Sequence, residues 1–123
     1  MADSHDLGQK GEALAAEYLE KAGYRIVQRN FKWGRNEIDI IAENDNFIVF
    51  TEVKTRSADF QVSPSAAVNR EKQKSVILAA DGYLKRFGID KESRFDVITV
   101  VKSSNSFDID HIENAFYPTL KKY

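Results

Sequence analysis

The sequence predicts an α/β domain in which two helices and five strands follow one another in the order α-β-β-β-α-β-β. Apolar residues recur at helical spacing over about 7–22 and 63–87, and a glycine follows each segment. Five other segments are apolar throughout or alternate between apolar and polar residues, as strands do. They lie at about 24–30, 37–43, 47–55, 94–101 and 107–112. The chain of 123 residues is long enough to bury its own core, so a single domain over 1–123 is expected, with tails at 1–6 and 117–123.

The composition excludes several classes of protein. The absence of cysteine excludes disulfide scaffolds, thiol catalysis and cysteine-rich zinc sites. No apolar run approaches the roughly 18 residues of a membrane span, and the first six residues lack the features of a signal peptide. A cytoplasmic protein without a membrane partner is therefore expected. The formal net charge is −1, so nucleic-acid binding would depend on a local basic patch.

The segment from Asn36 to Arg56 carries charged residues inside two apolar strands. If residues 45–46 form a two-residue turn, Asp39 on the first strand lies opposite Glu52 on the second, on the same face. Strand alternation places Lys54 on the same face as Glu52. A register shift by one residue would separate the two carboxylates onto opposite faces of the hairpin.

Two carboxylates about 4 Å apart repel each other by roughly 4 kcal/mol at an effective dielectric constant of about 20. A positive group is therefore expected between them, and Lys54 and a divalent cation are the candidates. Oxygen ligands without a thiol favour Mg²⁺ or Mn²⁺ over zinc. Such an ion can activate water against a phosphodiester, while Lys54 orients that water or neutralises charge on the phosphorus. A salt-bridge cluster on a solvated hairpin is the alternative, but the apolar residues on both faces of the strands favour the metal site.

Three other titratable residues are candidates to weigh beside this pair, namely Glu12, Glu37 and His111. Glu12 lies at the edge of the apolar stripe of the first helix, where it either faces a cleft or acts as a first-turn acid favoured by the helix dipole, and spacing alone favours the second interpretation. Glu37 is a second-tier candidate on the strand of Asp39. His111 has no partner at a spacing typical of metal or triad chemistry, so a structural role is expected.

A basic segment precedes the strand of Asp39. Between residues 24 and 36 there are four basic residues and no acidic one, with Trp33 among them. Basic side chains can contact phosphates and an aromatic ring can stack on a base, whereas the alternative is a solvated loop, over 31–35, anchored by a buried aromatic residue. The candidate nucleic-acid contacts are Arg35, Arg56, Lys72 and Trp33.

Several short motifs are spread over nearly the whole chain, and together they form a specific pattern. They are Gly11-Glu12, Asn30-Phe31, Glu37-Ile38-Asp39, Glu52-Val53-Lys54-Thr55-Arg56, Phe95-Asp96-Val97 and the segment from His111 to Phe116. In these motifs the chain resembles the YraN family of small bacterial proteins, within the restriction-endonuclease-like PD-(D/E)xK superfamily. The resemblance implies a central mixed five-stranded sheet flanked by helices, and kinship with Holliday-junction resolvases.

The resemblance also bears on individual residues. In the resolvases a glutamate of the first helix joins the aspartate and the glutamate at the metal, so the resemblance makes Glu12 a third ligand and reverses the preference drawn from spacing. Asn36 replaces a glycine that usually precedes the Glu-Ile-Asp segment, and asparagine tolerates a left-handed backbone better than most residues. Ile38 occupies the position of the proline in the PD-(D/E)xK motif. Many members of the superfamily lack this proline, and it takes no part in the chemistry.

The sequence therefore predicts a Mg²⁺- or Mn²⁺-dependent endonuclease that hydrolyses phosphodiester bonds, with DNA as the expected substrate. Asp39, Glu52 and Glu12 are the predicted metal ligands, and Lys54 completes the catalytic group. A non-catalytic nucleic-acid-binding or protein-binding module on the same fold is the alternative, and a metal-free structural protein is a third interpretation. Cleavage of a junction would call for a symmetric homodimer.

Overall fold

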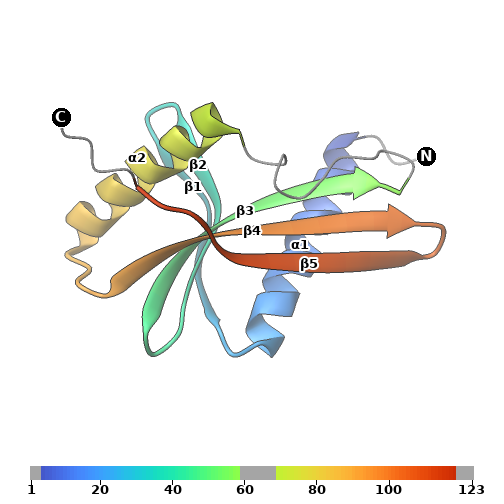
Figure 1. Cartoon of the computed structure of the whole chain (residues 1–123), viewed down its shortest axis with the longest axis horizontal. Helices are drawn as coiled ribbons and strands as arrows, with labels where there is room; N and C mark the ends of the chain where they lie inside the picture. Colours follow the sequence, from blue (N-terminus) through green and yellow to red (C-terminus); the bar gives the residue numbers. More distant parts are fainter. Residues whose placement is uncertain (1–3, 59–68, 119–123) are drawn as a thin grey trace.

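The structure is a computed structural model that describes residues 4–58 and 69–118. Its elements are α1 (Ser4–Lys21), β1 (Arg25–Trp33), β2 (Asn36–Glu43), β3 (Phe47–Ser57), α2 (Arg70–Phe87), β4 (Glu92–Ser103) and β5 (Ser106–Phe116). The five strands form one sheet in the order β1-β2-β3-β4-β5 (Figure 1). β3 and β4 pair in parallel and the other neighbours pair antiparallel, so the sheet is mixed. The predicted α/β class and element order are confirmed, and the arrangement is consistent with a restriction-endonuclease-like core.

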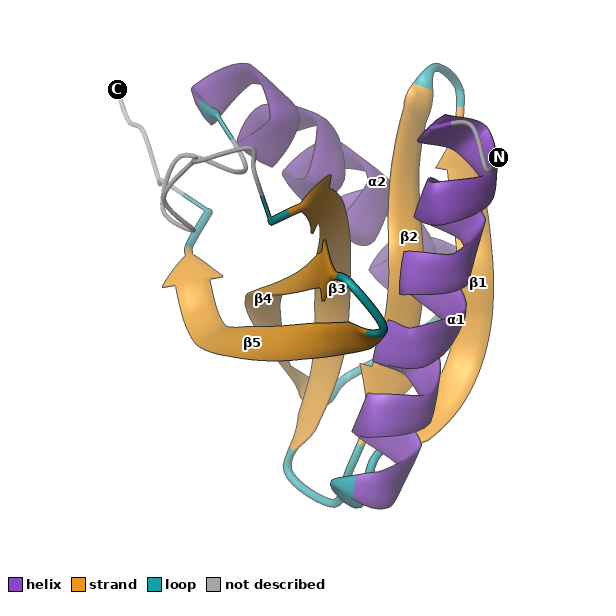
Figure 2. Ribbon diagram, turned by 90° about the vertical axis from the view of Figure 1, so that its right-hand side faces the viewer, coloured by secondary structure: helices purple, strands orange, loops and turns teal. Residues whose placement is uncertain are grey.

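The two helices cover opposite faces of the sheet (Figure 2). On the α2 face, Phe50 packs in one core with Tyr83 of the helix. On the α1 face, Ile40 and Val100 pack in a second core with Leu19. The middle strands are buried on both faces because each face has its own helix, as their nearly continuous apolar sequences indicate. No helix within the described residues has both the length and the apolar character needed to cross a membrane.

The β2–β3 hairpin has the register that the sequence predicts. The backbone N–H of Asn44 donates to the carbonyl of Phe47 over 3.0 Å and closes a two-residue turn. The side chain of Asn44 also accepts the backbone N–H of Phe47, over 2.8 Å. Farther along the hairpin, Ile40 pairs with Thr51. The next residues outward are Asp39 and Glu52, which therefore lie opposite each other.

The alternation of β2 is interrupted at Asp39. Ile38 packs in the core beneath α2 and Ile40 packs in the core beneath α1, although a regular strand would place them on one face. On β1, the residue between the pairing partners of these two isoleucines is Asn30, and its φ of 53° is left-handed. Both strands are therefore irregular at the level of Asp39.

Several predicted boundaries differ from the structure. Residues 4–6 belong to α1 and not to a tail, and residues 31–33 continue β1 and are not a loop, because Phe31 is buried and pairs with Ile38. The left-handed residue of the β1–β2 turn is Gly34, with a φ of 63°. Asn36, which the sequence suggested for that role, pairs with Trp33.

The second helix and the carboxyl-terminal segment also differ in part from the prediction. α2 begins at Arg70, and the predicted start of its helix at 63–64 lies outside the described residues. Tyr117 follows β5 and is exposed, as expected of a tail, whereas residues 119–123 lie outside the described part of the chain.

Gly82 lets α2 approach the sheet, and we expect Gly82→Ala to lower the free energy of unfolding by about 1–3 kcal/mol. A Cβ at this position would overlap the ring of Trp33. This cost should exceed the gain of about 1 kcal/mol that alanine brings to a helix interior. Urea unfolding followed by circular dichroism measures the change.

The matched control is Gly8→Ala in α1, where an added Cβ has no atom within 4 Å. This control should be neutral or stabilising by up to about 1 kcal/mol. If Gly82→Ala is as stable as the wild type, the close approach of α2 to Trp33 is not required by the fold.

Candidate metal site

Asp39 and Glu52 face each other at the point where β2 and β3 cease to pair through their backbones. The carboxylate of Glu52 accepts the backbone N–H of Asp39 through Oε2, over 3.3 Å. The carboxylate of Asp39 accepts the backbone N–H of Val53 through Oδ2, over 2.8 Å. Each side chain thus accepts a backbone N–H of the facing strand, in place of the carbonyl that would accept it in a continuous β-ladder. These two hydrogen bonds hold each acid against the other strand.

Both acids are hard to ionise in this position. Burial and then the nearby charge of Asp39 raise the pKa of Glu52 to about 8, although Lys72 acts in the opposite direction. Burial also raises the pKa of Asp39, against the hydrogen bond from Val53, and the charge of Glu12 adds to the rise. A further positive charge between the two carboxylates would therefore stabilise their ionised forms.

Lys72 is the cation that the structure pairs with this site. Its Nζ lies 3.3 Å from Glu52 Oε1. The first turn of α2 holds its backbone, because the Asn69 side chain at the N-cap accepts the Lys72 N–H over 2.8 Å. Burial lowers the pKa of Lys72, but the charges of Glu52 and Asp39 outweigh burial and leave that pKa raised.

Lys54 follows Glu52 on β3 and is half-buried, but it forms no hydrogen bond or ion pair with any residue in the described part of the chain. The sequence predicts Lys54 and a divalent cation as the candidates for the positive group between the carboxylates, and it predicts Lys72 only as a phosphate contact. In the structure Lys72 also pairs with the carboxylate of Glu52. The signal that could have indicated this was its place in the first turn of a helix that follows the strand of Glu52.

Glu12 lies beside the pair and is held by β1. Its Oε1 accepts hydrogen bonds from Arg29 Nη2 over 2.8 Å and from Asn30 Nδ2 over 3.0 Å. Gly11 brings this part of α1 against β3, since a Cβ on Gly11 would overlap the side chain of Thr55. Over residues 4–58 and 69–118, no group of three or more histidine or acidic side chains is compact enough to hold a metal. The role of Glu12 as a third ligand therefore stays a prediction.

The donor set of Asp39 and Glu52 nevertheless fits a hard divalent cation. Backbone hydrogen bonds use Asp39 Oδ2 and Glu52 Oε2, so each carboxylate has a second oxygen that the backbone does not use, and that of Glu52 lies 3.3 Å from Lys72 Nζ. Mg²⁺ is usually held in enzymes by one or two carboxylates, with water and substrate phosphate completing its shell. Two carboxylates with raised pKa values are also a site at which bound positive charge is favourable.

The remaining predicted residues surround this site without completing it. Glu37 pairs with Lys32 over 3.0 Å on the exposed side of the β1–β2 hairpin. Arg35 is exposed in the turn of that hairpin, and Arg56 is half-buried towards the end of β3. The role of both arginines as phosphate contacts stays a prediction.

Trp33 is engaged in packing. Its ring lies against Gly82, stacks with Phe31 at a centroid distance of 6.4 Å, and has the guanidinium of Arg86 over it at 4.8 Å. These contacts favour the packing interpretation of Trp33 over a free stacking surface for a base.

Comparison with known proteins assigns the family. The model of the uncharacterised protein family UPF0102 matches residues 11–100. The chain belongs to this family. A UPF0102 protein of Bacteroides thetaiotaomicron is 48% identical over 98% of this chain and 99% of its own length. UPF0102 proteins of Parabacteroides distasonis and Chlorobium phaeobacteroides are 45% and 48% identical, over 95% and 94% of this chain and over 97% and 96% of their own lengths.

The segment matched by the UPF0102 model contains Glu12, Asp39, Glu52 and Lys72, so the whole candidate site lies in the part of the chain that defines the family. The resemblance to the YraN family drawn from the sequence is thereby confirmed. The family description names no activity, so the chemistry of the site rests on its own geometry.

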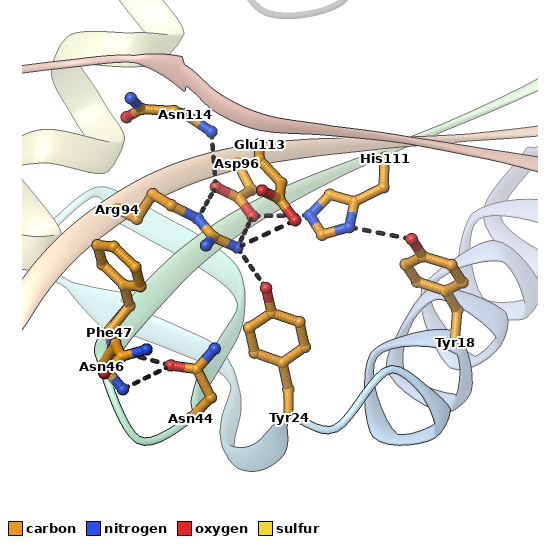
Figure 3. A network of polar contacts seen from close by, with 10 residues as sticks. All are labelled: Tyr18, Tyr24, Asn44, Asn46, Phe47, Arg94, Asp96, His111, Glu113 and Asn114. Atoms are coloured by element: carbon orange, nitrogen blue, oxygen red, sulfur yellow. Dashed lines mark hydrogen bonds and ion pairs between the residues drawn. The ribbon is translucent and has the colours of Figure 1, made fainter.

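A second buried polar cluster of this UPF0102 protein centres on Asp96 of β4, which is fully buried (Figure 3). Its carboxylate accepts from Arg94 Nε and Nη2 over 2.9 and 2.8 Å, from His111 Nε2 over 2.7 Å, and from the backbone N–H of Asn114 over 3.0 Å. Burial raises the pKa of Asp96, but the hydrogen bonds from His111 and Arg94 outweigh it and leave that pKa low. The hydroxyl oxygen of Tyr18 on α1 lies 3.2 Å from His111 Nδ1, so the cluster connects α1 to the sheet. This arrangement is consistent with the structural role expected for His111.

The pKa of Glu52 predicts how stability depends on pH. The folded protein keeps a proton on Glu52 up to about pH 8, whereas the unfolded chain releases it near the ordinary value of 4.5. The folded state therefore binds more protons between these values, so the free energy of unfolding should fall as the pH rises from about 5 to about 9. The fall caused by Glu52 should be a few kcal/mol.

The variant Glu52→Gln removes this titration, so its free energy of unfolding should depend less on pH than that of the wild type. Chemical unfolding of both proteins across the same pH range measures the difference between the two curves. Parallel curves would show that Glu52 ionises in the folded protein much as it does in the unfolded chain.

Proposed function

We propose that this UPF0102 protein is a metal-dependent nuclease that hydrolyses phosphodiester bonds, with DNA as the expected substrate. The observation that carries the proposal is the reciprocal placement of Asp39 and Glu52, which face each other while burial raises the pKa of both. Two neighbouring acids whose ionisation is disfavoured by burial are costly in a fold that is stable by only about 5–15 kcal/mol. A bound divalent cation turns this arrangement into a favourable one and accounts for its presence.

The proposed chemistry assigns a task to each group of the chain. When bound, the metal supplies a Lewis acid and a water of lowered pKa. Asp39 and Glu52 would hold it, since the facing strand fixes both carboxylates in place. Glu12 is the proposed third ligand, and Arg29 and Asn30 fix its orientation. Lys54, on the strand of Glu52, is the proposed ammonium that positions the attacking water or neutralises charge on the phosphorus.

The proposed contacts with the nucleic acid lie around the same site. The β1–β2 turn is tied to α2 because Ser75 donates a hydrogen bond to the side chain of Asn36 over 2.9 Å. Ser75 lies three residues after Lys72 on α2, and Asn36 directly follows the exposed Arg35. Together with Arg56, Arg35 and Lys72 would form the local basic patch that a chain of net charge −1 needs in order to bind phosphates.

A non-catalytic nucleic-acid-binding or protein-binding module on the same fold is the second candidate. The observation that favours it is that Glu12 is bound to Arg29 and Asn30 and does not close a compact group of three acids in the described structure. Such a module would keep the carboxylate pair and bind its partner without turnover.

Cleavage assays and calorimetry test the proposal together. We expect the wild type to bind Mn²⁺ and to cleave at least one of branched, nicked or single-stranded DNA in its presence. Asp39→Ala should lose Mn²⁺ binding, because it removes one of the proposed carboxylate ligands, and should cut at least about 100-fold more slowly.

Asp81→Asn is the matched control, because Asp81 is an exposed acid of α2 that pairs with Lys85 and not with any residue of the candidate site. It should keep both activities. Metal binding without cleavage of any substrate would favour the binding module, and no metal binding by the wild type would leave the carboxylate pair as a structural feature.

A further inference from the structure

Lys72 and a metal would require the same oxygen of Glu52. Glu52 Oε2 is used by the backbone N–H of Asp39, and Oε1 lies 3.3 Å from Lys72 Nζ. Within the described residues, no other lysine or arginine is paired with either Asp39 or Glu52. A divalent cation and an ammonium on one oxygen repel each other, so the binding of either at Oε1 weakens the contact of the other.

The ammonium of Lys72 can leave Glu52 without disturbing the fold. The Asn69 side chain holds the Lys72 backbone N–H over 2.8 Å, so the first turn of α2 stays in place when the side chain moves. The Lys72 side chain is 35% exposed, whereas that of Glu52 is 2% exposed. The lysine therefore reaches a buried carboxylate from the protein surface, with four methylene groups that can turn towards solvent or a ligand.

We infer that Lys72 is an internal counterion that couples metal binding to nucleic-acid binding. Lys72 lies against Glu52 Oε1 and offsets the negative charge of the Asp39–Glu52 pair while no metal is bound, and it gives up Oε1 when a divalent cation arrives. The released ammonium then contacts a phosphate oxygen of the nucleic acid. This inference rests on the proposed function and adds an order to it, because metal binding strengthens nucleic-acid binding and the nucleic acid strengthens metal binding by the same factor.

Calorimetry on the full chain tests the first half of the inference. Lys72→Met removes the competitor for Oε1, so it should bind Mn²⁺ roughly threefold to tenfold more tightly than the wild type. Lys54→Met is the matched control, since Lys54 is a lysine on the same strand as Glu52 and forms no ion pair with the described residues. It should change the affinity less. Equal or weaker Mn²⁺ binding by Lys72→Met would overturn the inference.

DNA binding with and without Ca²⁺ tests the second half, with Ca²⁺ used as a cation that carries the charge without supporting turnover. The wild type should bind an oligonucleotide more tightly when Ca²⁺ is present. In Lys72→Met this gain should be smaller, and Lys72→Arg should restore it because the positive charge returns. An undiminished gain in Lys72→Met would show that Lys72 does not transfer to the phosphate.

Thermal unfolding of the metal-free proteins separates this inference from the proposed function. If the wild type binds no Mn²⁺, the metal site fails, but Lys72→Met should still unfold at a lower temperature than Lys54→Met, because the Asp39–Glu52 pair has lost its cation. Equal melting temperatures would overturn the counterion role itself. Lys72→Gln keeps a polar side chain at this position and serves the same comparison if Lys72→Met does not fold.

Discussion

The contact between Asp39 and Glu52 across β2 and β3 is the constraint on which the rest of the site depends. Each carboxylate accepts a backbone N–H of the opposite strand in place of a regular ladder bond. β3 can lose this pairing to β2 because it stays paired with β4 over its whole length. The irregular backbone at Asn30 and Asp39 therefore lies beside a strand that is held from its other side, and the two acids remain in place against their repulsion.

The position of α1 brings a third acid near this pair. Near its beginning, Gly11 lets the helix lie against Thr55 of β3, and farther along, Tyr18 reaches His111 of β5. His111 is in turn bound to the buried Asp96, whose carboxylate also holds Arg94. Because both the close approach and the buried polar cluster fix the helix, Glu12 stays beside Asp39 and raises its pKa. The cluster thus supports the candidate site from a distance.

The features predicted correctly from the sequence depend on neighbouring stretches of chain, whereas the missed ones depend on packing between distant segments. Hairpin register follows from a two-residue turn, so the meeting of Asp39 and Glu52 could be predicted. The pairing of Lys72 with Glu52 requires knowing how α2 lies on the sheet, which no periodicity shows. The interruption of β2 at Asp39 likewise depends on the packing of Ile38 and Ile40 into cores on opposite faces of the sheet. A regular period of two residues cannot indicate it.

The most direct measurement is anomalous diffraction at the manganese edge from crystals of the protein grown with Mn²⁺. The account predicts an anomalous peak between the carboxylates of Asp39 and Glu52, bonded to oxygens of both, with the Lys72 ammonium displaced from Glu52. Crystals of Asp39→Ala grown in the same way should lack the peak. A wild-type site without a peak at saturating Mn²⁺, with Lys72 still paired with Glu52, would contradict the account.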